Sequence, residues 1–140
     1  EGRPRAGQVA GSLKKHGYVQ MNVDGRSYDA HRLVWLYMTG EWPSGIVDHK
    51  DCNGSNNRWD NLRQATVSQS SANRRVYSNS AFRLKGVAKT KGGRYVGQIG
   101  HTHEGKTVRK HLGVFDTPEE AHAAYLEAAK ERYGEFMRAS

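Results

Sequence analysis

Apolar and polar residues first alternate between residues 17 and 28, where Val19, Met21 and Val23 are separated by polar positions. Alternation on both sides of the Asp24-Gly25 pair predicts a β-hairpin that turns there. From Ala30 to Met38 the apolar residues instead form a run, which predicts a short, well-buried helix ending at Thr39-Gly40. Residues 1–12 show no apolar period and predict a loose basic arm.

The middle of the chain alternates between short apolar pairs and polar stretches. Ile46-Val47 predicts a brief strand, and the polar, turn-rich residues 50–61 predict a compact Ω-type loop. Residues 62–66 are expected to form a second strand, residues 67–76 a polar helix, and residues 77–82 a linker.

The last third of the chain has a different pattern. Residues 85–89, 94–99 and 109–115 predict three strands, with turns at Gly92-Gly93 and over residues 101–106. The segment 116–120, DTPEE, provides a cap residue, an early proline and acids at the positive end of a helix dipole. An apolar stripe then continues at helical spacing to Tyr133, and Gly134 ends it. In this helix we expect the aromatic side chains of Tyr125 and Tyr133 to pack in a core together with Phe115.

These elements predict an α+β fold made of two small domains. We place the first at residues 1–78 and the second at residues 79–140, where a three-stranded antiparallel sheet should pack on one C-terminal helix. A domain of this size buries little of its surface, so bound metal or DNA could add to its stability.

The composition favours a polyanionic partner. Lys and Arg number 22 against 14 Asp and Glu, a formal net charge of +8. A soluble protein that is merely basic, as ribosomal proteins are, remains an alternative. The single cysteine, Cys52, excludes an intrachain disulfide and a four-cysteine zinc site, and an intracellular location fits it. No apolar run approaches the roughly 18 residues of a membrane span, and no secretory signal is seen, so we expect no membrane partner.

The positive charge is concentrated in the predicted sheet. Residues 83–111 contain eight Lys and Arg against one acid, a net +7, whereas residues 116–138 contain three against six, a net −3. One sheet face could therefore meet phosphates while an acidic helix packs behind it. A basic face that is only solvated is the alternative.

The residues that could perform chemistry follow the Ile46-Val47 strand. Asp48 and His49 place a possible metal ligand beside a possible general base, because Mg²⁺ prefers oxygen ligands and histidine accepts a proton near neutral pH. Asn53, Asn57 and Asn61 are suited to hold the following loop in turns. An Asp-His pair alone is weak support, since a hydrogen-bonded surface pair has the same sequence.

The wider run AHRLVWLYMTGEWPSGIVDHKDCNGSNNRWDNLRQAT resembles the HNH nucleases of phages and group I introns. The resemblance extends over residues 30–75 and implies a ββα-metal fold. It also implies that Asp48 is a ligand of Mg²⁺ or Mn²⁺, that His49 is the general base, and that Asn61 braces the loop across from His49. We expect His31 to pack or hydrogen-bond near the motif rather than to act in the chemistry.

One position departs from the family pattern. The helix after the motif usually contains Thr-x-x-x-Asn-x-x-Asn, and here the first asparagine, commonly the second metal ligand, is Ser70. Asn73 matches the second asparagine. A serine hydroxyl is a shorter and poorer ligand than an amide carbonyl. Ser70 therefore implies weakened metal binding and attenuated cleavage.

Residues 85–136 resemble the plant Apetala/ethylene-response-factor DNA-binding domain, which also occurs fused to phage HNH nucleases. The matching pieces are KGV at 85–87, GRYVGQI at 93–99, LGVFDTPEEA at 112–121, and Ala124-Tyr125 through Ala128-Ala129. That family lays its sheet in the major groove. The resemblance implies that residues on the strands contact DNA, namely Lys85, Lys89, Arg94, Tyr95 and Arg109. To these we add Arg74 and Arg75 at the end of the predicted helix 67–76. Tyr95 could contact DNA or only brace the sheet. Because Ala88 and Thr90 stand where plant members often carry Arg, the plant target sequence cannot be carried over.

Together these features predict a metal-dependent, homing-type DNA endonuclease that nicks one strand of double-stranded DNA. A DNA-binding protein with a decayed nuclease motif, and a basic RNA-binding protein, remain alternatives. We expect no small-molecule substrate, a monomer with a dimer left open, and a location in the cytoplasm of a bacterial or phage-infected cell, associated with the nucleoid.

Overall fold

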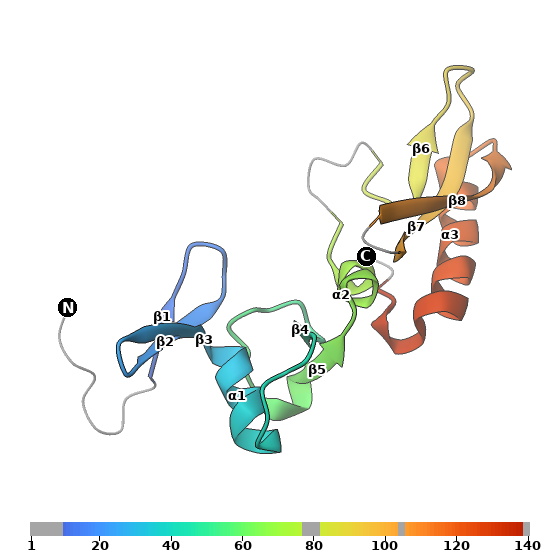
Figure 1. Ribbon diagram of the computed structural model, residues 1–140. Coiled ribbons are helices and arrows are strands. Elements are labelled where there is room, and N and C mark those ends of the chain that lie inside the picture. Colours follow the sequence, from blue (N-terminus) through green and yellow to red (C-terminus); the bar gives the residue numbers. More distant parts are fainter. Residues whose placement is uncertain (1–9, 77–81, 104–105, 139–140) are drawn as a thin grey trace. The chain divides into compact units, whose positions relative to one another are not determined.

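The computed structural model describes residues 10–76, 82–103 and 106–138, apart from the side chains of residues 101–103 (Figure 1). By its internal contacts the chain divides into two compact units, Glu1–Ala65 and Thr66–Ser140. The described residues form three α-helices and antiparallel sheets, which confirms the expected α+β class. The functional boundary predicted between residues 78 and 79 stays a prediction; by contacts, the segment after Ala65 belongs to the second unit.

The first unit begins with a three-stranded antiparallel sheet of β1 (Ser12–Leu13), β2 (Val19–Val23) and β3 (Arg26–Asp29). The predicted hairpin is confirmed, because Asp24 (φ 48°) and Gly25 (φ 75°) both have the positive φ of a type I′ turn. Strand β1 was not predicted. Residues 12 and 13 pair with β2 instead of belonging to a loose arm, because backbone pairing needs no apolar period. Residues 1–9 of that arm lie outside the described residues.

Helix α1 (Ala30–Thr39) confirms the predicted helix, and Gly40 ends it with a positive φ and an N–H bonded to the Leu36 carbonyl. The expectation that it is well buried was wrong. Only Ala30 and His31 are buried, and the side chain of Tyr37 is 87% exposed. A unit this small covers one side of a helix, so the apolar run is wider than the surface that packs.

The rest of the first unit is a two-stranded antiparallel sheet. Strand β4 (Ile46–His49) pairs with β5 (Leu62–Ala65), with His49 opposite Leu62 and Asp48 opposite Arg63. A polar loop and the short 3₁₀ helix η1 (Trp59–Asn61) connect them. The side chains of Val47, Leu62 and Ala65 are buried, and β4 is two residues longer than predicted because its polar residues also pair.

The second unit begins with α2 (Val67–Asn73), which ends three residues earlier than predicted. The hydroxyl oxygen of Thr66 accepts from the Gln69 N–H, and the Gln69 side chain accepts from the Thr66 N–H. This capping box satisfies two donors that the first helical turn leaves unbonded. The linker predicted at residues 77–82 falls mostly outside the described residues.

The three predicted C-terminal strands are confirmed as an antiparallel sheet in the order β6-β7-β8 (Figure 1). They are β6 (Val87–Lys89), β7 (Tyr95–His103) and β8 (Lys106–Phe115). The last two extend into the turn predicted over residues 101–106, of which 104 and 105 are not described. Helix α3 (Pro118–Tyr133) packs against all three strands and is followed by the 3₁₀ helix η2 (Gly134–Phe136).

The core of the second unit lies between the sheet and the two helices. It contains Ala72, Ile99, Tyr125, Ala129 and Tyr133, which confirms core packing for the two tyrosines, whereas Phe115 is half-buried. The Tyr133 hydroxyl donates to the Gly100 carbonyl at 2.6 Å. Gly97 allows the close approach of helix and sheet, because a Cβ there would lie 2.9 Å from the Ala121 carbonyl oxygen.

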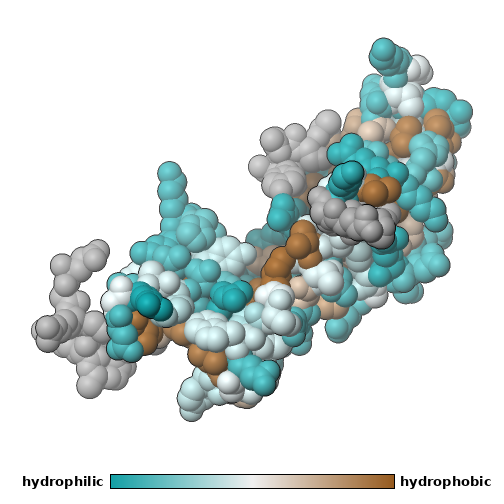
Figure 2. Space-filling view, viewed as in Figure 1, coloured by the Kyte–Doolittle hydropathy of each residue, from teal (hydrophilic) through white to brown (hydrophobic). Residues whose placement is uncertain are grey.

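The surface in view is mostly hydrophilic, with hydrophobic residues scattered among polar ones (Figure 2). Single exposed apolar residues are normal for a globular protein and do not by themselves indicate an interface. Within the described ranges, no helix is both long and apolar enough to cross a membrane.

Candidate functional site

Asp48 and His49 end strand β4 and are buried, with 8% and 4% of their surfaces exposed. The register of the sheet places Arg63 of β5 opposite Asp48, and the Arg63 Nε donates to the Asp48 Oδ2 at 3.2 Å. Burial of a charge is costly unless it is paired and hydrogen-bonded, so this ion pair offsets part of the cost of burying the carboxylate. Arg63 was missed at the sequence level because its proximity depends on the strand register.

The imidazole of His49 is held by Asn57. The His49 Nε2 lies 2.9 Å from the Asn57 Oδ1. With the amide oxygen as acceptor, Nε2 carries the proton and donates, which leaves Nδ1 as the ring nitrogen that can accept a proton. Asn57 thus holds the imidazole of His49 at one of its ring nitrogens.

The loop after β4 is organised around Asp51. Its carboxylate accepts from the Asn53 N–H at 2.8 Å, the Asn56 Nδ2 at 2.7 Å and the Asn61 Nδ2 at 3.0 Å. Burial raises the pKa of Asp51, but these hydrogen bonds outweigh it and the net effect lowers that pKa. Asp51 was not singled out from the sequence, although its position between Asp48-His49 and the asparagines could have indicated it.

Asn61 is buried in the same loop, as its predicted bracing role requires. Its Oδ1 accepts from the Asp51 N–H at 3.1 Å, and its Nδ2 also donates to the Asn56 carbonyl at 2.7 Å. The side chain of Asn57 also lies against the imidazole of His49. Asn61 thus contacts the loop that it was predicted to brace, and Asn57 of the same loop contacts the imidazole.

Two further rings lie against His49. The ring centroid of His31, on α1, is 5.1 Å from that of His49 in an edge-on contact, and the centroid of Tyr18 is 5.7 Å away. Desolvation by burial, followed by the neighbouring charge of protonated His49, lowers the pKa of His31 to about 4. His31 is therefore neutral near pH 7, as a packing residue beside the motif should be.

Comparison with protein families finds a match for the segment that contains this site. The model described as HNH endonuclease matches residues 28–72. Residues 28–72 form an HNH endonuclease domain. No curated protein and no solved structure matched the chain. The match includes Asp48, His49 and Asn61, and it indicates a nucleic-acid endonuclease.

The donor atoms of the HNH domain fit a hydrated divalent cation rather than a closed protein cage. Asp48 supplies one buried carboxylate, and no group of three or more His, Cys, Asp or Glu that could hold a metal occurs among the described residues. Mg²⁺ commonly keeps several waters and binds through one or two carboxylates together with substrate phosphates. Ser70, the position to which the family pattern assigns a second ligand, is half-buried on α2.

In the second unit, the sheet register separates the predicted DNA-binding residues. Ile99 is 3% exposed and packs with Tyr125 of α3, so alternate residues of β7 face the helix and Gln98 and Gly100 face away. Arg109 lies opposite Gly100, so it occupies the face turned away from α3. His111, opposite Gln98, is exposed on the same face and was not predicted.

Lys89 and Tyr95 lie on the other face. They oppose each other across β6 and β7, and the Lys89 Nζ is 6.0 Å from the centroid of the Tyr95 ring. The Tyr95 ring also meets Phe82, with centroids 5.3 Å apart. These contacts favour the bracing role over the DNA-contacting role for Tyr95.

The two remaining strand-side cations have protein partners. Arg94 pairs with Asp116 at 2.8 Å, on side chains that are 55% and 80% exposed, so solvent weakens the pair and leaves Arg94 accessible. The Lys85 Nζ instead donates to the carbonyls of Ala72 and Arg138, at 2.8 and 2.7 Å. Lys85 thus connects the end of α2 to the C-terminal segment.

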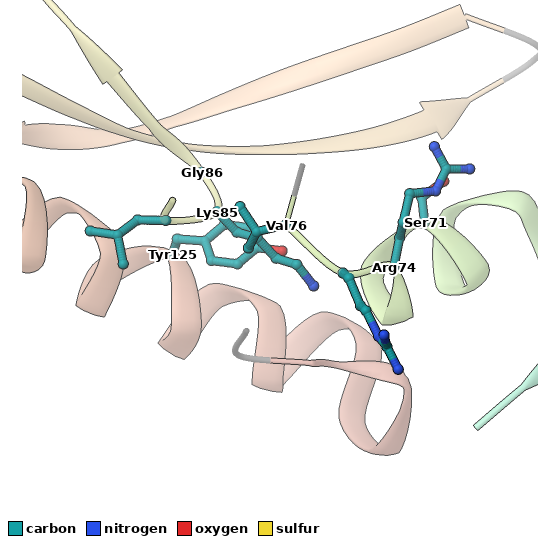
Figure 3. A pocket seen from close by; sticks show the side chains of 8 residues that line it. Ser71, Arg74, Val76, Lys85, Gly86 and Tyr125 are labelled. Atoms are coloured by element: carbon teal, nitrogen blue, oxygen red, sulfur yellow. The ribbon is translucent and has the colours of Figure 1, made fainter. Parts of the chain in front are cut away.

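A basic cavity of about 320 Å³ lies beside this connection (Figure 3). Tyr125 of α3 forms one wall beneath the segment that carries Lys85 and Gly86, and the end of α2 forms another. No acid is among its lining residues: Ser71, Arg74, Arg75, Val76, Leu84, Lys85, Gly86 and Tyr125. Arg74 and Arg75 are exposed, so the cavity presents positive charge at its rim.

Proposed function

We propose that the chain is a metal-dependent, homing-type DNA endonuclease that nicks one strand, with His49 as its general base. The observation that supports this most is the placement of His49: it is buried at the end of β4 directly after the buried Asp48, and its Nε2 lies 2.9 Å from the Asn57 Oδ1, within an HNH endonuclease domain.

In the proposed reaction, the Nδ1 of His49 removes a proton from water as the water oxygen attacks the phosphorus of a phosphodiester. The bond from phosphorus to the 3′ oxygen breaks, which leaves a 3′ hydroxyl and a 5′ phosphate. A divalent cation held by Asp48 would polarise the phosphate and stabilise the leaving oxygen. One such site per chain cuts one strand per encounter, so a monomer nicks.

The second unit is proposed to hold the DNA. Arg109 on the sheet face turned away from α3, together with Arg74 and Arg75 at the rim of the basic cavity, offers cations to backbone phosphates. The resemblance of residues 85–136 to a sheet-type DNA-binding domain supports this role. Lys85, whose ammonium is bonded to two carbonyls, is proposed to organise the cavity instead.

Nicking of supercoiled plasmid with Mg²⁺ or Mn²⁺ tests the proposal. The wild-type chain should convert supercoiled to open-circular DNA, and a chelator should stop it. His49→Ala should lower the rate by about 10² to 10⁴, with DNA affinity unchanged, because only the general base is lost. Full activity of His49→Ala would remove His49 from the mechanism.

Two asparagines of the loop after β4 provide a test substitution and its matched control. Asn57→Ala removes the bond to the His49 Nε2 and should lower the cleavage rate. Asn53→Ala changes an exposed side chain that bonds to Ser55, away from His49, and should leave the rate near that of the wild type. Equal effects of both substitutions would show that the loop, and not the orientation of His49, limits the reaction.

A DNA-binding protein with an inactive nuclease site is the second candidate. The Arg63 guanidinium occupies one oxygen of Asp48, and Ser70 replaces the family's asparagine; both features weaken a cation site. This candidate is favoured if the wild-type chain binds DNA but does not nick it with either metal.

A further inference from the structure

Tyr18 connects the N-terminal sheet to the catalytic loop, although it lies outside the segment that matches the HNH family model. It precedes β2, and its carbonyl accepts from the Lys14 N–H at 2.8 Å, which closes the turn between β1 and β2. Its ring lies directly over Gly54 of the loop after His49, where an added Cβ would be 2.9 Å from a ring carbon. The position of Tyr18 is therefore defined from both sides.

The Tyr18 ring also contacts both histidines of the site. Its centroid lies 5.4 Å from that of His31 and 5.7 Å from that of His49, and the two histidine centroids are 5.1 Å apart. Each ring thus touches the other two. Such edge-on and tilted contacts are the favoured geometries for aromatic pairs.

These contacts restrict the orientation of His49. The bond from Nε2 to Asn57 fixes one atom of the imidazole, but rotation about the bond that joins the ring to Cβ is broad and only weakly restricted. Further contacts on the ring add to this bond in setting the direction in which Nδ1 points. The rings of His31 and Tyr18 supply these contacts.

We propose that Tyr18 is a positioning residue, whose ring and not whose hydroxyl holds the imidazole of His49 in its catalytic orientation. The role rests on the proposed function, since it concerns the general base of that reaction. It extends the site to the N-terminal sheet. The segment that matches the HNH model therefore lacks one of the rings that pack against His49.

Steady-state nicking by the full chain tests the proposal, with Tyr18→Leu and Tyr18→Phe compared. Tyr18→Leu should lower kcat by about 10-fold to 100-fold, because misplacing a reacting group costs rate even when substrate binding is intact. KM should be unchanged, and Tyr18→Phe should retain the wild-type kcat. Tyr28→Leu, which removes a ring stacked on Trp42, is the matched control and should leave kcat unchanged.

Imidazole NMR resonances of His49 give a readout that loss of stability would not move. They should be shifted by the Tyr18 ring current in the wild type and in Tyr18→Phe, and should move in Tyr18→Leu. If Tyr18→Leu does not fold, as judged by tryptophan fluorescence, Tyr18→Met fills the space with a flexible side chain and replaces it.

The outcomes distinguish failure of the positioning role of Tyr18 from failure of the proposed nuclease function. Unchanged kcat in Tyr18→Leu, while His49→Ala abolishes nicking, would overturn the positioning role and leave the nuclease function standing. An equal loss in Tyr18→Phe, or a raised KM with unchanged kcat, would also overturn it, because the hydroxyl or a substrate contact would then be responsible. Absence of nicking in the wild type would overturn the proposed function itself.

Discussion

Acidification should destabilise the first unit through His31. The pKa of this histidine is lowered from 6.5 to about 4, mainly because burial disfavours the charged ring and then because of the charge on His49. The unfolded chain therefore binds the proton at a higher pH than the folded chain does. The stability that neutral His31 contributes is complete above pH 6.5 and is lost as the pH falls toward 4. At about 1.36 kcal/mol for each pH unit, this interval corresponds to at most about 3 kcal/mol of unfolding free energy.

Urea unfolding followed by tryptophan fluorescence measures this loss in the right place, because the three tryptophans, Trp35, Trp42 and Trp59, all lie in the first unit. With about 1 to 3 kcal/mol per molar urea for a small domain, the midpoint should fall by about 1 to 3 M between pH 7.5 and pH 4.5 because of His31. The His31→Phe variant keeps a ring that cannot be protonated. Its urea midpoint should therefore fall only by the amount that other titratable groups cause. An equal fall in both proteins would refute the argument that His31 is buried in its neutral form.

Four further outcomes test other parts of the structure. Ser70→Asn should raise the nicking rate at fixed Mg²⁺ or Mn²⁺, since it restores a carbonyl oxygen; no change in rate or metal dependence, together with loss of activity in Asn73→Ala, would place the ligand at Asn73 instead. Thr117→Ala should cost about 1 kcal/mol of unfolding free energy in a circular-dichroism urea titration, because it removes the cap of α3, and an unchanged midpoint would contradict this. Gly86→Ala should destabilise the second unit by more than about 1 kcal/mol in the same assay, since φ there is 72° and a Cβ would collide with the Tyr125 ring; wild-type stability would mean that the ring can move away. Arg109→Gln should reduce the log–log salt slope of DNA binding, measured by fluorescence anisotropy, by about 0.9 for one lost phosphate contact, and an unchanged slope would place the DNA elsewhere.

The local elements followed from the sequence because their causes are local. An Asp-Gly pair between alternating residues favours one turn type, and a Thr-Pro-Glu-Glu start favours a helix, whatever surrounds them. The Asp48-His49 pair could be found for the same reason, since both residues are adjacent in one strand. The sequence did not predict which apolar residues are buried. Helix α1 carries a continuous apolar run, yet its Tyr37 is 87% exposed.

Which residues meet across the site was decided by pairing and packing. The β4–β5 register brings Arg63 to Asp48, and the fold of the intervening loop brings Asn57 rather than Asn61 to His49. In the second unit, the pleat and a bulge near Gly97 place Arg109 and His111 on one face of the sheet, whereas Lys89 lies on the other. A shift of one residue in any strand pairing would reverse such assignments, because side chains alternate between faces.

The sequence by itself therefore determined the class of elements, the adjacent Asp48-His49 pair and the basic charge, all of which depend on residue type and short spacing. The tertiary structure alone decided that Tyr18 and His31 enclose His49, since the three rings come from the start of β2, the start of α1 and the end of β4. No local pattern encodes that meeting. It arises because Tyr18 packs on Gly54 of the loop while His31 of α1 packs against His49.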